Sequence, residues 1–117
     1  MAVGAYDRML ERFAEATEPE VSEFVAMALY NKGNRLSAMD KPAEAIESYD
    51  EVIARFGNDA RMPERIAKAM INRANQLGIR RKKAEANAGY QAVIDKFAGS
   101  SNADVQLQVA NARKWKN

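Results

Sequence analysis

The feature that most constrains the fold is an apolar pattern that occurs three times. The three segments are AYDRMLERFA (5–14), SYDEVIARFG (48–57) and GYQAVIDKFA (89–98). Each has a Tyr followed three, four and seven residues later by an apolar side chain, the last always Phe. This spacing places the four side chains on one stripe of an α-helix. Because Tyr6, Tyr49 and Tyr90 are 43 and 41 residues apart, the chain is predicted to consist of a repeated unit.

A second repeated element lies between these stripes. The segment VAMALYNKGNRL (25–36) aligns with IAKAMINRANQL (66–77), again 41 residues further on. Both segments have a small residue, Gly33 or Ala74, at the same position. A Gly inside a helix costs roughly 0.5–1 kcal/mol relative to Ala, so Gly33 indicates a point of close packing. The chain is therefore predicted to alternate two types of helix.

Turn residues between the stripes set the expected helix boundaries. Pro42 is expected to open a helix, and Gly57 is expected to be a C-terminal glycine cap. The turn at 80–83 contains neither Gly nor Pro and is inferred from the repeat alone. The predicted helices span residues 3–15, 19–38, 42–56, 60–79, 84–97 and 102–115.

The composition excludes several classes of function. The 117 residues are 47% hydrophobic and 29% charged, which indicates one ordinary globular domain. No apolar run is long enough to insert into a membrane, and the first residues do not resemble a signal peptide. The chain has no Cys and no His, so no enzyme activity, metal or cofactor is expected. A net charge of +2 is too balanced to predict nucleic-acid binding.

Helix pairs with small residues at fixed spacing resemble tetratricopeptide repeats, in the longer form found in many bacterial members. The matching residues of the first copy are Leu29, Gly33, Leu36, Ala45, Tyr49 and Val52, and those of the second are Met70, Ala74, Leu77, Ala86, Tyr90 and Val93. Lys32 and Arg73 depart from the pattern, because Leu is usual there. Gly57 and Ala98 also depart from it, because Pro is usual there.

The resemblance implies an all-α fold, a right-handed α-solenoid of antiparallel helix pairs with about six helices. The single domain 1–117 would contain an orphan second helix at 3–15, repeat one at 19–56, repeat two at 60–97 and a C-terminal capping helix at 102–115.

In this family the first helices of the pairs line a concave groove that binds peptides. The resemblance therefore implies a protein–protein interaction scaffold that binds a peptide or helical segment of a partner. The corresponding groove residues are Met27, Tyr30, Asn31, Asn34 and Ala38 from one helix and Lys68, Ile71, Asn72, Asn75 and Ile79 from the next. The Asn amides suit the backbone of an extended peptide, because each donates and accepts hydrogen bonds. The alternative is that they make helix-to-helix hydrogen bonds.

A carboxylate clamp, with which some relatives hold acidic C-termini, is disfavoured. Asn34 and Asn72 match two of its positions, but Tyr30, Asn111 and Trp115 occupy the three basic ones. The cluster RRKK at 80–83 is expected to be a solvated turn rather than an anion site. Trp115 is expected to pack one face against the preceding helix pair.

Self-assembly is the alternative function. The orphan helix 3–15 would expose Val3, Met9 and Leu10, which a second chain would cover to form a homo-oligomer. The expected compartment is the cytoplasm, with the periplasm left open because similar long repeats occur there.

Overall fold

The computed structural model describes residues 19–116, and the regular structure in that part of the chain is entirely helical. Its helices are α2 (Pro19–Ala38), α3 (Pro42–Phe56), α4 (Pro63–Ile79), α5 (Lys83–Phe97) and α6 (Ala103–Trp115). The all-α class is therefore confirmed. The helix predicted at 3–15 lies outside the described residues, as do Val3, Met9 and Leu10, on which the self-assembly alternative rests.

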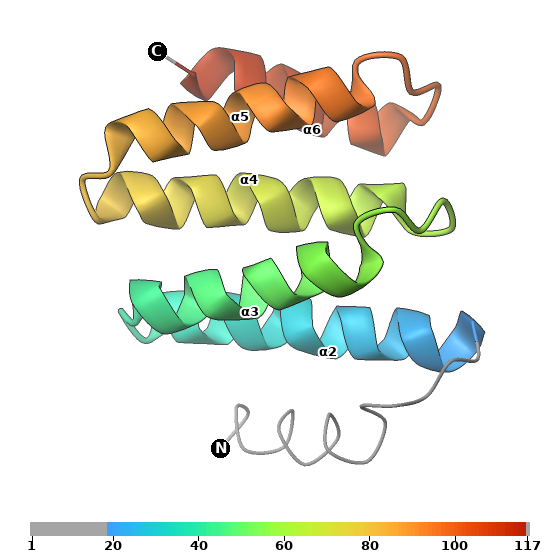
Figure 1. The fold of residues 1–117 in the computed structure, drawn as a ribbon, viewed down its shortest axis with the longest axis horizontal. Coiled ribbons are helices and arrows are strands. Elements are labelled where there is room, and N and C mark those ends of the chain that lie inside the picture. The colour runs from blue at the N-terminus through green and yellow to red at the C-terminus, as the bar shows by residue number, and fades with distance from the viewer. Residues whose placement is uncertain (1–18, 117) are drawn as a thin grey trace.

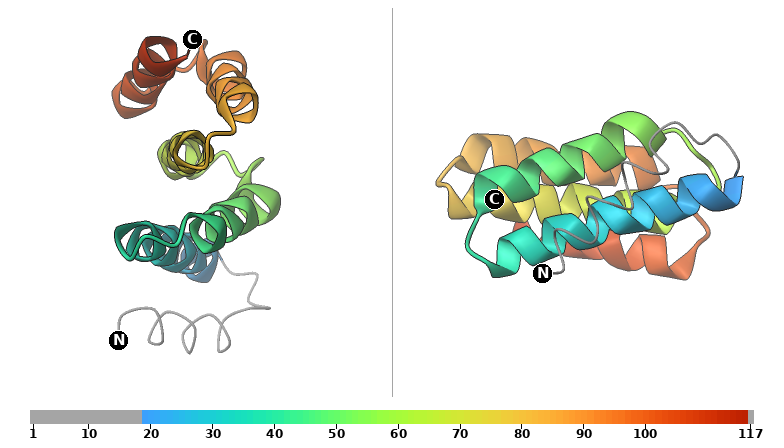
Figure 2. Two further views of the ribbon diagram at one scale, coloured as in Figure 1. Left: turned by 90° about the vertical axis from the view of Figure 1, so that its left-hand side faces the viewer. Right: turned by 90° about the horizontal axis from the view of Figure 1, so that it is seen from below.

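Consecutive helices run antiparallel and form two layers. Figure 1 shows the chain reversing direction at each turn. The end-on view in Figure 2 places α2, α4 and α6 in one layer and α3 and α5 in the other. Within residues 19–116, α4 contacts α2 and α6 as well as its neighbours in sequence, whereas α3 and α5 do not contact each other. The shortest dimension is 19 Å, which is close to two helix diameters.

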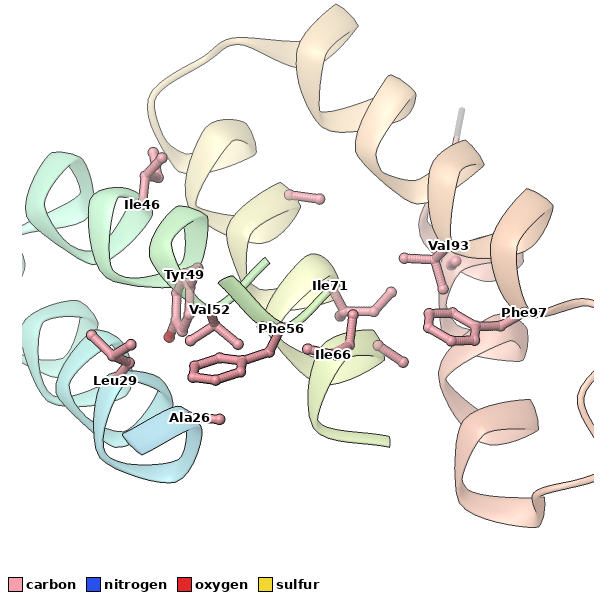
Figure 3. Packing of buried hydrophobic residues seen from close by; sticks show 14 of the residues in the cluster. Ala26, Leu29, Ile46, Tyr49, Val52, Phe56, Ile66, Ile71, Val93 and Phe97 are labelled. Atoms are coloured by element: carbon pink, nitrogen blue, oxygen red, sulfur yellow. The ribbon is translucent and has the colours of Figure 1, made fainter. Parts of the chain in front are cut away.

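The two predicted Tyr–Phe stripes that lie within the described residues, those of α3 and α5, form part of the core. Tyr49, Val52 and Phe56 of α3 are buried, and Figure 3 shows them packed beside α2 and α4. Tyr90 and Phe97 are buried in the same way on α5. The stripes of α3 and α5 are therefore core, as their helical spacing predicted.

The start of α4 differs from its prediction. The helix was expected to begin at residue 60, but it begins at Pro63. The Arg61 backbone N–H donates to the Asp59 carboxylate at 2.9 Å, and this turn occupies the intervening residues. Met62 is not helical, with φ of −137° and ψ of 48°, because a residue before Pro is disfavoured in the helical region. Pro42 opens α3 as predicted.

Gly57 is the C-cap residue of α3, as expected, but it does not take the left-handed conformation that favours glycine. Gly57 has right-handed helical dihedrals, and the left-handed residues in the described part of the chain are Asp40 (φ 59°) and Arg81 (φ 62°). At both positions, the backbone N–H of the following residue donates to a carbonyl in the last turn of the helix. Lys41 donates to the Leu36 carbonyl and Lys82 to the Leu77 carbonyl, each at 2.9 Å. The turn predicted at 80–83 is thus confirmed, and the same motif closes both first helices.

Gly33 is the predicted close-packing point. A Cβ atom added to Gly33 would lie 2.5 Å from Cε1 of Tyr49, so no side chain fits there. In the second pair the corresponding residue is Ala74, and the facing residue on α5 is Gly89. A Cβ on Gly89 would lie 3.0 Å from the Ala74 Cβ. In the first pair the residue without a side chain is on the first helix, α2, whereas in the second pair it is on the second helix, α5.

We expect Gly33→Ala to lower the free energy of unfolding by about 1–3 kcal/mol, because the added methyl overlaps a buried ring. Urea unfolding followed by circular dichroism measures the change. Gly78→Ala is the matched control, because nothing lies within 4 Å of a Cβ at that helical position. It should stabilise the chain by roughly 0.5–1 kcal/mol. Equal effects of the two substitutions would contradict the close contact.

We expect Arg81→Gly to stabilise the chain by about 1 kcal/mol, because a left-handed residue with a Cβ is strained by that order. Thermal unfolding checks this prediction. The control is Arg80→Gly, since Arg80 has a negative φ of −80° and gains nothing from Gly. The left-handed turn would not be a source of strain if Arg80→Gly raised the melting temperature as much.

Candidate functional site

A polar hollow of about 210 Å³ lies between α2 and α4, and we name it the amide hollow. Its lining residues are Asn34, Ser37, Tyr49, Asn72, Asn75 and Gln76. The residues from α2 and from α4 recur three or four positions apart, so each helix turns the same face toward the hollow. Tyr49 reaches it from α3.

A chain of hydrogen bonds ties three helices together at this hollow. The Tyr49 hydroxyl donates to Asn34 Oδ1 at 2.5 Å. The Asn72 amide nitrogen donates to the same oxygen and to the Tyr30 hydroxyl, both at 3.1 Å. Gln76 Nε2 donates to Ser37 Oγ at 2.7 Å. These bonds fix the amide of Asn34 with its oxygen toward the protein.

The same bond recurs in the second helix pair. The Tyr90 hydroxyl donates to Asn75 Oδ1, as Tyr49 donates to Asn34, with both partners shifted by 41 residues. The interpretation of Asn34, Asn72 and Asn75 as helix-to-helix hydrogen-bonding residues is therefore confirmed.

Each of these three amides has one hydrogen-bonding group that the internal bonds do not use. Asn34 and Asn75 use their oxygens as acceptors, so their NH₂ groups have no protein partner within residues 19–116. Asn72 uses its NH₂ group, so within the same residues its carbonyl oxygen has no donor. The amide hollow thus presents two donor groups and one acceptor held in fixed orientations.

A second hollow of about 300 Å³ adjoins the start of α4, and we name it the charged hollow. Its charged lining residues are Glu23, Arg61, Glu64, Arg65 and Lys68. Tyr30, Met62, Pro63 and Asn102 complete its lining.

Most of these charges have partners. Lys68 Nζ lies 2.7 Å from the Glu64 carboxylate, and this hydrogen bond raises the pKa of Lys68 and lowers that of Glu64. Arg61 pairs with Asp59. The Arg65 guanidinium carbon lies 5.8 Å from the centroid of the Tyr30 ring, within range of a cation–π contact.

The structure divides the predicted groove residues between several places. Asn34, Asn72 and Asn75 line the amide hollow, and Tyr30 and Lys68 line the charged hollow. Met27 and Asn31 are half-buried on α2 and line neither of these two hollows. Ala38 and Ile79 are exposed at the ends of α2 and α4.

The expectation that Ile71 lines the groove is wrong. Its exposed fraction is 2%, and Figure 3 shows it on the side of α4 that faces Val93 and Phe97. The physical reason is the central position of α4, which contacts helices on several sides and so buries more of its circumference than α2.

Several lining residues were missed by the sequence reasoning. Ser37 and Gln76 follow Asn34 and Asn72 at helical spacing, and this spacing could have revealed them. Arg61 and Arg65 had no such signal, because their relation to Tyr30 depends on how α2 and α4 pack.

Two other sequence expectations concern the surface. The Trp115 ring lies 6.3 Å from the Tyr90 ring, is tilted by 58° to it and stays 42% exposed, so it contacts α5 of the preceding helix pair. Residues 80–83 are all exposed; the first three form the turn between α4 and α5, and Lys83 begins α5.

The chain was compared with protein-family models, with curated proteins and with solved structures, and none of them matched. None of the helices in residues 19–116 is both long and apolar enough to cross a membrane. Among the described residues, no cluster of three or more Asp or Glu side chains could hold a metal ion.

We expect Tyr49 to make stability depend on alkaline pH. Burial raises the pKa of Tyr49 from 10 to about 12; the nearby Tyr30 adds to the shift and a hydrogen bond with Asn72 opposes it. The folded state favours the neutral phenol. The resulting contribution to the free energy of unfolding is therefore complete below pH 10 and is lost as pH rises toward 12.

The measurement is urea unfolding of the wild type and of Tyr49→Phe between pH 8 and pH 12, a range set about these two pKa values. At the lower end, Tyr49→Phe should be less stable by about 0.5–1.5 kcal/mol, because it lacks the bond to Asn34. The deficit of Tyr49→Phe should shrink above pH 10 and change sign before pH 12, because the ionisation of Tyr49 removes more stability from the wild type than one hydrogen bond contributes. A constant difference over the whole range would contradict the shifted ionisation.

Proposed function

We propose that this chain is a protein-interaction scaffold of the tetratricopeptide type, which binds an extended segment of a partner protein along the α2–α4 surface. We propose the right-handed α-solenoid of that family as its architecture, and three observations support a solenoid of repeated helix pairs. Each described helix contacts only the next one or two along the chain. The Tyr–Asn bond and the left-handed helix end also recur at the same 41-residue interval.

The observation that carries the proposal is the unused capacity of the amide hollow. An extended peptide presents backbone carbonyl and N–H groups in alternation. The NH₂ groups of Asn34 and Asn75 are suited to such carbonyls, and the carbonyl of Asn72 is suited to an N–H. Asn34 and Asn75 are held by buried tyrosines, and Asn72 is held by Asn34 and the half-buried Tyr30, so binding costs little additional ordering of side chains.

The size and lining of the hollow favour a peptide over a small molecule. Its volume of about 210 Å³ is below the 300–1,000 Å³ range of ordinary small-ligand pockets. Its lining side chains are polar and not apolar, whereas small-molecule pockets are mostly apolar. A shallow polar strip between two helices suits a backbone that crosses it.

The experiment is the double variant Asn34→Asp, Asn75→Asp. An Asp keeps the acceptor oxygen that Tyr49 and Tyr90 need, so the fold should be retained, but it removes the outward NH₂ group. Peptides selected from a displayed library against the wild type are then titrated by fluorescence anisotropy. We expect binding to weaken about 10-fold or more, since each lost hydrogen bond contributes roughly 0.5–1.5 kcal/mol.

The control is Asn58→Asp, which adds a negative charge in the exposed turn before α4. It should bind the same peptides with unchanged affinity. If the double variant binds them as tightly as the wild type, the assignment of the amide hollow is wrong.

A further inference from the structure

Within residues 19–116, Arg65 is the cation of the charged hollow that has no carboxylate partner. Lys68 has Glu64 and Arg61 has Asp59 as an ion-pair partner, but within residues 19–116 no carboxylate lies within 4 Å of the Arg65 guanidinium. Its guanidinium instead lies over the Tyr30 ring. A guanidinium held in this way presents a planar fork of donors that matches a carboxylate.

The positive charge of the hollow that is available to a ligand is that of Arg65. Arg61 is paired with Asp59 and Lys68 with Glu64, and Glu23 adds a further carboxylate to the lining. A partner carboxylate can pair with Arg65 and brings only one negative charge. A phosphate, with nearly two negative charges, would be repelled more strongly by the carboxylates of Glu23 and Glu64.

The two hollows are consecutive along one surface and share a hydrogen bond. Tyr30 lines the charged hollow, Asn72 lines the amide hollow, and the Asn72 amide donates to the Tyr30 hydroxyl at 3.1 Å. The same tyrosine therefore positions Arg65 with its ring and Asn72 with its hydroxyl. A segment bound in one hollow would lie next to the other.

We propose that the charged hollow receives the carboxylate of an Asp or Glu side chain of the partner segment whose backbone occupies the amide hollow. This inference rests on the proposed function. The lining residues of α4 in the two hollows centre about nine positions apart, or about 14 Å at the helical rise. An extended chain covers that length in about four or five residues. The partner thus carries its acidic residue four or five positions from the segment in the amide hollow.

The test uses the peptides selected from the displayed library, each synthesised with an acetylated N-terminus and an amidated C-terminus. Every Asp or Glu is changed in turn to Asn or Gln, and affinities are measured for the wild type and Arg65→Gln. We expect one acidic position whose neutralisation weakens wild-type binding by about 10- to 100-fold, as for hydrogen bonds to charged groups. In Arg65→Gln the same peptide change should have little effect.

Arg55→Gln is the matched control, because Arg55 also lies over an aromatic ring, that of Phe56, but belongs to α3 in the other layer. It should behave as the wild type. Arg65→Lys keeps the charge without the planar fork and should show an intermediate loss. Circular dichroism confirms that each variant is folded.

The outcomes separate the two proposals. If peptides bind and depend on Asn34 and Asn75, but Arg65→Gln loses no acidic preference, the carboxylate site is wrong and the scaffold stands. If no peptide binds the wild type, or binding ignores the amide hollow, the proposed function is wrong and the carboxylate site falls with it.

Discussion

The contact between Tyr49 and α2 is the interaction on which the rest of the structure depends. Its ring lies against Gly33, which allows α2 and α3 to approach closely, and its hydroxyl donates to Asn34. The ring limits the distance between the helices, and the hydroxyl limits their rotation. Because Asn34 also accepts from Asn72, the same contact extends to α4. The buried Tyr49 side chain thus links α2, α3 and α4.

The same hydrogen bonds stabilise the fold and orient the amide groups that line the amide hollow. Each bonded Asn has one end of its amide turned inward to a tyrosine or another amide, and its other end stays available. A substitution that removes the whole amide, such as Asn34→Ala, would therefore disturb packing and surface together. Exchanging only the outward nitrogen, as in Asn34→Asp, separates the two roles, because the inward oxygen keeps its donors.

The two helix pairs keep the same backbone geometry with different residues. Close contact requires a missing side chain on one of two facing positions, and the first pair has it at Gly33 while the second has it at Gly89. A left-handed residue ends both first helices, yet it is Asp40 in one and Arg81 in the other. Neither is the glycine that such a position favours, so these turns persist because the packing of the flanking helices outweighs local strain.

The sequence alone determined the helices and most of the core, because apolar periodicity and Pro42 act over a few residues. The resemblance to tetratricopeptide repeats singled out the carboxamides, but it left two roles open for them. Only the tertiary structure decided that Asn34 turns its oxygen to Tyr49, that Ile71 is buried, and that Arg65 lies over Tyr30. Each of these depends on how distant helices approach and rotate against one another, which no local pattern in the chain encodes.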